Sequence, residues 1–434
     1  MTTQPISICK YMFYMATLAG LSCLFTDHVY AITLEESVAK ALSSSEQARV
    51  IQESRKYFDA EAQKVDAFTK PRVDTSVKYY ELGTTVQESI FMATPDRQMT
   101  TGLTASKLLW SGDRINQSRV LKESLMGLAQ IEERSMRRDL AKQVSNAFLE
   151  VLYHQARINV LKDRVKQRTD ELIDATDLFD AGIVTNLDVR EANLQLHVAE
   201  DDLRAGESQL HTSLVDFNLT IGESTDKTQT LLTPEGGLVR PREINEKLIR
   251  LETLYKEKQQ IDIKRAGQSL NIAEKNLALA KDEVKPALSL VGTTEYGGEK
   301  FDELEASWSV GSQLTWNFYD GGTVDANIAS ARAQKKSREA TLHQAEKSVS
   351  GALNKLNREV DSLNRRIALQ EDTVSLSNGN YQDARRLYLT GTMTLTRLGD
   401  FNLLYAEARF NLLHLYYLEN VIVIEVGSLT GDGF

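Results

Sequence analysis

The chain has 434 residues, with 51 Lys plus Arg against 61 Asp plus Glu and therefore a formal net charge of −10. This acidic balance argues against nucleic acid as a partner, because the phosphate backbone is recognised by basic surfaces. The two cysteines, Cys9 and Cys23, both lie near the amino terminus. The rest of the sequence therefore offers no thiolate ligand, cysteine nucleophile or disulfide.

The first 31 residues predict a signal peptide. A basic residue precedes an apolar run over residues 11–25, and the segment Val29–Ala31 places small residues at the −3 and −1 positions of a cleavage site. We therefore expect export, with residues 1–31 removed. A lipoprotein anchor at Cys23 is the alternative, although the residues before it match a lipobox poorly. No later segment has about 20 consecutive apolar residues, so a membrane would have to be crossed by strands.

A helix and two strands follow the leader. Residues 32–68 have helical periodicity behind a Thr33 cap, and Pro71 ends the pattern. Apolar and polar side chains then alternate over residues 72–82 and 98–110, which is the period of a strand with one polar face. We expect these strands to form a hairpin with a long loop.

The same order of elements returns later in the chain. Helical periodicity covers residues 243–284, and alternation predicts strands over residues 287–297 and 305–318. The strands end in aromatic residues, which prefer the boundary between lipid headgroups and hydrocarbon. The predicted membrane-interface aromatics are Trp110, Trp316, Phe318 and Tyr319. The alternative interpretation is a two-sided sheet in a soluble domain.

Two long segments without proline predict very long helices. They cover residues 113–181 and 323–390, and apolar residues recur in them every seven positions. Each helix would be about 100 Å long at about 1.5 Å per residue. The second carries two adjacent apolar seams, which a helix needs when it packs between two neighbours. The seams are Leu342, Val349, Leu356 and Leu363, and Leu353, Val360, Ile367, Val374, Tyr381 and Tyr388.

Two glycine turns indicate an internal duplication. Gly182 and Gly391 each stand where a long helix should stop, and a Thr three residues later can cap the returning helix. They are 391 − 182 = 209 residues apart, and Gly112 and Gly321 are also 321 − 112 = 209 residues apart. The predicted segments are residues 32–221 and 243–426 for the two repeats, 222–242 for the crossing between them and 427–434 for a loop-like tail. The predicted fold class is mainly α, with duplicated coiled-coil hairpins and a small transmembrane β part of four strands.

No catalytic, cofactor or metal site can be assembled from the sequence. The histidines are scattered over helices without the i, i+4 spacing of a zinc-binding helix. No phosphate-binding loop or nucleophile elbow follows a predicted strand, and the glycine pairs are better interpreted as loop glycines. We therefore expect a protein that is not an enzyme and has no cofactor.

The order of these elements resembles the TolC-type outer-membrane efflux and secretion channels. The segments that carry the resemblance are Phe179–Gly182, Tyr388–Gly391 and Trp316–Gly322, and it spans roughly residues 32–426. It implies a homotrimer whose subunits each give four strands to a twelve-stranded barrel in outer-membrane lipid, with the helices forming a periplasmic tunnel. The residues alone require only that the subunit oligomerises, because four strands cannot close a barrel. Two, three or four copies would satisfy that requirement.

The resemblance also implies two functional sites on the helical hairpins. The turns would be the tips that dock a periplasmic adaptor protein: Gly182, Ile183, Val184, Thr185, Gly391, Thr392, Met393 and Thr394. Residues beside the turns would form a gate that closes the tunnel: Asp188, Tyr388, Arg397 and Asp400. Arg397 stands where the family often has an acidic residue. The resemblance therefore does not decide whether cations block this channel as they do in the family. The alternative is that all four are solvated helix residues.

The sequence therefore predicts an outer-membrane exit duct of a Gram-negative bacterium, for a tripartite efflux pump or type I secretion. An inner-membrane transporter of the ABC or RND type would supply the energy, and a periplasmic adaptor would join it to the duct. The rival hypothesis is a periplasmic or surface coiled-coil scaffold whose strands form a soluble sheet. The sequence does not say whether the cargo is small toxic compounds or secreted protein.

Overall fold

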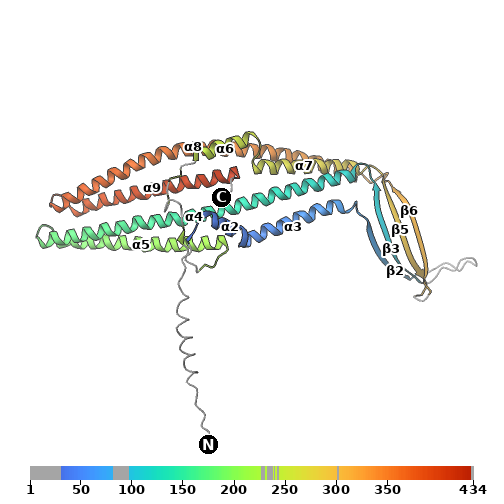
Figure 1. Ribbon diagram of the computed structural model, residues 1–434, viewed down its shortest axis with the longest axis horizontal. Coiled ribbons are helices and arrows are strands. Elements are labelled where there is room, and N and C mark those ends of the chain that lie inside the picture. The colour runs from blue at the N-terminus through green and yellow to red at the C-terminus, as the bar shows by residue number, and fades with distance from the viewer. Residues whose placement is uncertain are drawn as a thin grey trace, which may run out of the picture. The chain divides into compact units, whose positions relative to one another are not determined.

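The computed structural model describes residues 31–81, 97–225, 230–231, 238, 240–241, 244–300 and 303–431 (Figure 1). Almost all of the predicted signal peptide and the loop around Pro95 lie outside these ranges. The chain divides into two compact units. As far as they are described, the hairpin unit comprises Met1–Lys40, Val144–Val239 and Thr373–Tyr417, and the sheet unit comprises Ala41–Gln143, Arg240–Asp372 and Leu418–Phe434.

Four antiparallel strands lie side by side in the sheet unit, in the order β2-β3-β5-β6 (Figure 1). They are β2 (Arg72–Glu81), β3 (Arg97–Trp110), β5 (Ala287–Gly298) and β6 (Glu305–Thr315). The four predicted strands are confirmed, with one correction. β6 ends at Thr315, three residues before the predicted end at residue 318, because its partner β5 begins at Ala287 directly after Pro286, which has no N–H for the ladder.

The strand register places the apolar sides of all four strands on one face. Val73 pairs with Ala105, Ala105 with Gly292, and Gly292 with Val310. Since successive side chains of a strand point to opposite faces of the sheet, the next row of paired residues lies on the other face, and it is polar. That row contains Asp74, Thr104, Thr293 and Ser309. On the apolar face the side chain of Trp308 is 80% exposed and that of Val77 is 74% exposed, so this chain leaves that face uncovered.

Two of the predicted helices are each broken in two. The segment 32–68 forms α2 (Leu34–Ser44) and α3 (Glu46–Ala67), because the Ser45 hydroxyl accepts a hydrogen bond from the Ala48 backbone N–H and so starts a new helix. The segment 243–284 forms α6 (Ile244–Lys256) and α7 (Ile261–Asp282). Lys258 adopts a left-handed φ of 53° between them, which ends the first helix.

The long helices confirm the duplication with matching lengths. α4 (Arg114–Asp180) and α8 (Thr323–Leu389) have 67 residues each, while α5 (Asn186–Ile221) and α9 (Leu395–Thr430) have 36 residues each. Their starts are 323 − 114 = 209 and 395 − 186 = 209 residues apart. Six predicted seam residues of α8 are buried within the sheet unit: Val349, Leu353, Leu356, Val360, Leu363 and Ile367.

The hairpin unit has a core of its own, to which each of its four long helices contributes. The buried residues are Ala175, Leu178, Ala192, Tyr381, Ala384, Tyr388, Leu395 and Leu398. A short parallel pairing that the sequence did not predict joins β1 (Ala31–Ile32) to β4 (Thr230–Leu231) in the same unit.

The end of α9 corrects the predicted loop-like tail. The helix continues to Thr430 because Val426 is fully buried and anchors its last turns, and Gly431 then ends it with a φ of 70°. By length and composition α9 could also cross a membrane, but 39% of its most apolar window is buried inside the protein.

Candidate functional site

Each long helix folds back on its shorter partner through the same turn (Figure 1). The backbone N–H of Gly182 donates to the carbonyl of Phe179 at 2.9 Å, and that of Ile183 donates to Leu178 at 2.9 Å. In the second hairpin Gly391 donates to Tyr388 at 2.9 Å, and the residue after it donates to Leu387 at 3.0 Å. Both glycines have a φ of 73°, in the left-handed region that glycine adopts without strain. The predicted glycine turns are confirmed.

The threonine after each turn caps the returning helix, as predicted. The Asp188 carboxylate accepts hydrogen bonds from the backbone N–H and the hydroxyl of Thr185, at 2.8 and 2.7 Å. The bond from the Thr185 hydroxyl, followed by that from its backbone N–H, lowers the pKa of Asp188. In the second hairpin the Thr394 hydroxyl accepts a hydrogen bond from the backbone N–H of Arg397 at 3.4 Å.

The structure brings the two predicted tips together in the hairpin unit. A Cβ built on Gly391 would lie 3.1 Å from the Cγ2 of Ile183, so the turns are in van der Waals contact. Val184 and Met393 pack against the core of the unit. The Ile183 side chain stays exposed, which leaves apolar surface at the paired tips.

The predicted gate residues do not form one network within a single chain. Tyr388 is 1% exposed, and its hydroxyl has no hydrogen-bond partner among the described residues. Burial, followed by the negative charge of Asp188, raises the pKa of Tyr388 to about 12. Arg397 instead contacts its own helix, with an ion pair to Asp400 at 3.4 Å and its guanidinium 5.0 Å from the ring centre of Phe401.

A buried polar cluster that the sequence analysis missed joins three of the helices. The Nη1 of Arg168 donates to the Oε2 of Glu171 at 2.6 Å and to the Oε1 of Gln195 at 2.7 Å, and its Nη2 donates to the Gly399 carbonyl at 3.5 Å. The Nδ2 of Asn402 donates to the Oε1 of Glu171 at 2.8 Å. The signal in the sequence is a polar residue at a seam position, since Arg168 falls seven residues from both Leu161 and Ala175, which are buried.

The predicted interface aromatics are exposed in the sheet unit, as their proposed role requires. Phe318 and Tyr319 are each 86% exposed, and the rings of Trp316 and Phe318 are 5.8 Å apart and nearly perpendicular. The Nε1 of Trp316 donates to the Val284 carbonyl at 3.1 Å, which fixes this ring beside the start of β5. The Asp320 carboxylate then caps α8 by accepting from the backbone N–H groups of residues 322 and 324.

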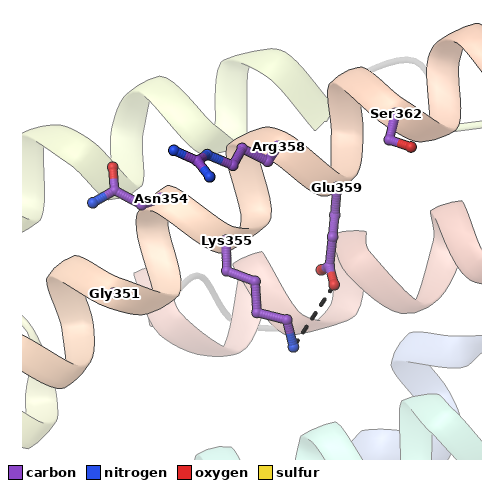
Figure 2. A pocket seen from close by; sticks show the side chains of 6 residues that line it. All are labelled: Gly351, Asn354, Lys355, Arg358, Glu359 and Ser362. Carbon is purple, nitrogen blue, oxygen red and sulfur yellow. Dashed lines mark ion pairs between the residues drawn. The ribbon is translucent and has the colours of Figure 1, made fainter.

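A shallow groove of about 480 Å³ runs along α8 in the sheet unit (Figure 2). It is lined by residues of one helix, most of which are polar in type: Gly351, Asn354, Lys355, Arg358, Glu359 and Ser362. Figure 2 shows Lys355 and Glu359 joined by an ion pair, whose atoms are 3.7 Å apart. No cluster of three or more metal-ligating side chains occurs in the described part of the chain.

Paired long helices together with a small antiparallel sheet that leaves its apolar face uncovered form a fold that this chain shares with solved outer-membrane proteins. The structure superposes on the outer membrane protein VceC of Vibrio cholerae with a TM-score of 0.78 and 16% identity, covering 92% of this chain and 96% of that one. It superposes on CusC with a TM-score of 0.76 and 18% identity, covering 92% of both chains.

Sequence comparison identifies the family. The profile of the outer membrane efflux protein family matches residues 38–223 and 257–431, and the chain belongs to this family. It is 21% identical over 342 residues to the outer membrane protein TolC of Vibrio cholerae, covering 75% of this chain and 77% of that protein. It is also 25% identical to nodulation protein T of Rhizobium leguminosarum bv. viciae, covering 56% of this chain and about half of that protein. The protein is an outer-membrane exit duct of the kind used by efflux pumps, with its helical tunnel in the periplasm.

Proposed function

We propose that three copies of this chain form a passive duct that carries substrates from an inner-membrane transporter across the periplasm and outer membrane. The observation that carries this proposal is the sheet, which has an uncovered apolar face and two open edges, β2 and β6. An open edge is not tolerated in lipid, because each unpaired N–H or C=O would lack a hydrogen-bond partner.

Ring closure is the expected way to complete this sheet. β2 and β6 are different strands, so pairing β2 of one copy with β6 of the next is a head-to-tail contact. Such contacts form a closed ring when the rotation between copies adds up to a full turn. The smallest barrels have about eight strands, which excludes a single copy. The TolC-type resemblance supports three copies.

Exposed apolar side chains on the hairpins also support contacts between copies. Leu187 and Leu194 on α5 and Leu376 on α8 are 63 to 69% exposed in the single chain. Water contact at such positions is unfavourable by about 25 cal/mol per Å² of apolar surface. Packing against the helices of neighbouring copies would remove it.

The tips are proposed as the adaptor-docking surface, and the helix starts beside them as the gate. The exposed Ile183 gives a partner an apolar contact on turns that backbone hydrogen bonds hold in place. Asp188, Arg397 and Asp400 lie in the first two turns of the helices that follow. The energy source would be an ABC- or RND-type transporter in the inner membrane, with cargo of either small compounds or secreted protein.

The first experiment tests the duct itself. The protein is expressed with its leader, recovered from membrane fractions and added to planar lipid bilayers. We expect recovery with the outer membrane, a requirement for detergent, an oligomeric band on unheated denaturing gels and discrete conductance steps. Release of the protein in buffer without detergent, together with no conductance, would favour the coiled-coil scaffold instead.

A second experiment tests the adaptor surface. A photo-crosslinking amino acid at Val184 should give an adduct with the periplasmic adaptor in cells, whereas the same group at Leu219, exposed near the other end of α5, should not. Adducts at Leu219 without any at Val184, in a correctly assembled channel, would move the docking surface away from the tips.

A further inference from the structure

The apolar face of the sheet carries a charged side chain near each end of β3. Arg97 begins the strand and Lys107 lies close to its end, and the strand register places both on the face of Leu103 and Ala105. Of the described strand residues, only these two and Glu81 are charged on this face. A charge on the lipid side of a barrel is unfavourable at the bilayer midplane and is tolerated near the two interfaces. The two cations therefore indicate where the apolar band begins and ends.

The spacing of the two cations matches the height of that band. They are 107 − 97 = 10 residues apart. A strand that rises about 3.4 Å per residue covers about 34 Å over this length. Strands of outer-membrane barrels tilt by about 40°, so the height is about 26 Å, close to the roughly 25 Å of their apolar band. Because β3 leads into α4 and the helical tunnel lies in the periplasm, Lys107 marks the periplasmic boundary.

The two cations differ in their partners. The Nε of Arg97 lies 3.9 Å from the Oε1 of Glu81. Lys107, in contrast, forms no ion pair with any residue that the structure describes. Three other cations near the periplasmic end of the sheet each have a carboxylate from their own segment: Lys70 has Asp66, Arg72 has Asp74, and Lys285 has Asp282.

A neighbouring copy does not supply the missing anion either. If β6 of the next copy pairs with β2, the only carboxylate that this strand brings is Glu305, which lies at the opposite end of the sheet. The charge of Lys107 is therefore left for an anion from outside the protein.

A β-bulge places a second hydrogen-bond donor beside Lys107. Residues three apart in a regular strand point to opposite faces, but the register of β3 shifts between Leu108 and Trp110. Trp110 therefore lies on the same face as Lys107, in the adjacent row of paired residues. Its side chain is 47% exposed, and no described residue accepts from its indole N–H. The Trp316 indole N–H, in contrast, is already bonded to the Val284 carbonyl.

We propose that Lys107 and Trp110 bind the phosphate of a glycerophospholipid headgroup from the periplasmic leaflet of the outer membrane. The ammonium supplies the opposite charge, and the indole N–H supplies a directional hydrogen bond to a phosphate oxygen. Leu290 lies opposite Lys107 and is 44% exposed, so apolar surface for the acyl chains adjoins the two donors. This proposal rests on the proposed duct function, since only a sheet inserted in lipid meets such a headgroup.

The test measures lipid retention by the purified, assembled oligomer. The protein in detergent is titrated with dioleoylphosphatidylglycerol, and the bound lipids are counted by native mass spectrometry. We expect one retained lipid per subunit in the parent. Lys107→Gln should weaken retention by roughly tenfold or more, because it removes a hydrogen bond between charged groups. The matched control is Arg97→Gln, which removes the other cation on the same strand and face and should leave retention at the parental value.

Conservative variants separate the two donors from a general effect on packing. Lys107→Arg keeps the charge and should retain the lipid. Trp110→Phe keeps an aromatic ring but removes the N–H, and should weaken retention by roughly three- to tenfold, the effect of one neutral hydrogen bond. If Lys107→Gln does not assemble, the comparison of Trp110→Phe with Arg97→Gln decides the outcome.

Two further ligands identify the group that is recognised. Dioleoylglycerol has the same acyl chains without a phosphate, and it should bind the parent and Lys107→Gln equally. Millimolar sodium phosphate should not displace the phospholipid, because the free ion has no acyl chains to occupy the apolar rows. Displacement by the free ion would overturn the assignment to a lipid.

Equal retention of phosphatidylglycerol by the parent and Lys107→Gln would also overturn the proposal, as would an equal loss in Arg97→Gln. Failure of the duct function has a different signature. The parental protein would then be released without detergent, and no assembled oligomer would appear in the mass spectrum.

Discussion

All ten residues of β2 and all eleven of β6 are exposed, whereas the hairpin unit buries Tyr381, Tyr388 and Leu398 among its own helices. The hairpins thus carry a hydrophobic core within one chain, and their fold is specified by ordinary burial. The sheet has its regular hydrogen bonds but no cover on its apolar face. Its folding free energy must therefore depend on an environment outside the chain, which lipid and neighbouring copies can provide.

The largest effect is expected in the hairpin core. Leu398→Ala should lower the stability of the isolated subunit by about 2 to 5 kcal/mol, because Leu398 is fully buried and the smaller side chain leaves a cavity. Leu376→Ala, at a position 69% exposed, is the matched control and should change stability little in an isolated subunit. Thermal unfolding followed by circular dichroism makes the comparison. Equal losses would mean that contacts between copies, rather than the internal core, hold the hairpins.

The stability of the sheet should depend on contact between its apolar face and lipid, rather than on packing within the chain. Trp308→Arg, on the apolar face, should cost roughly 2 to 4 kcal/mol if the residue lies near the bilayer midplane, and Ser309→Arg on the opposite face should cost less. The amount of assembled oligomer in outer-membrane fractions is the measurement. Equal tolerance of both changes would contradict a barrel whose apolar face meets lipid.

A smaller effect is expected at the tips, where backbone geometry matters more than burial. Gly182→Val should cost about 1 to 2 kcal/mol, because the φ of 73° is unfavourable for a side chain with a Cβ. Gly379→Val is the control, since Gly379 lies within α8 with no atom near its added Cβ and no positive φ. The melting temperature and the Val184 adduct yield should fall together for Gly182→Val. An unchanged adduct yield would show that the partner does not require this turn.

The cap at the start of α5 should make a pH-dependent contribution to the free energy of unfolding. Asp188→Ala should cost about 1 kcal/mol at neutral pH by removing the two hydrogen bonds to Thr185. The folded-state pKa of Asp188 lies below its usual 3.8, so this stabilisation is complete above that pH and is lost as pH falls through the folded-state pKa. The stabilities of parent and variant, measured by denaturant unfolding, should therefore converge at acidic pH. A constant difference would contradict the cap.

The smallest change in stability is expected at the proposed gate. Arg397→Ser with Tyr388→Phe removes an exposed ion pair worth about 0 to 1 kcal/mol and a hydroxyl that has no partner within the described chain. If these residues link neighbouring copies, conductance should still rise, and high salt should reproduce part of the rise in the parent by screening. An unchanged conductance in an assembled double variant would place the constriction elsewhere along the tunnel.

Much of this architecture follows from the sequence because it is encoded locally. The alternation of strand residues, the absence of proline in the long helices, and the glycines at positions 182 and 391 each specify the conformation of a short segment. The 209-residue spacing then predicted two matching hairpins, which have equal lengths in the structure. The caps at Thr185 and Thr394 were predictable for the same reason, since a cap involves residues only three positions apart.

The remaining features depend on contacts between segments that are distant in sequence. The strand register gathers the apolar sides of all four strands on one face. It depends on the pairing of β3 with β5, which are separated in sequence by more than half of a repeat. No local pattern determines that pairing. The burial of Tyr388 is set by how the four long helices pack in the hairpin unit, and the contact between Glu171 and Asn402 by how α4 meets α9. Periodicity identifies which face of a helix is buried, but only tertiary packing decides which partner that face meets, because many pairings bury similar apolar area.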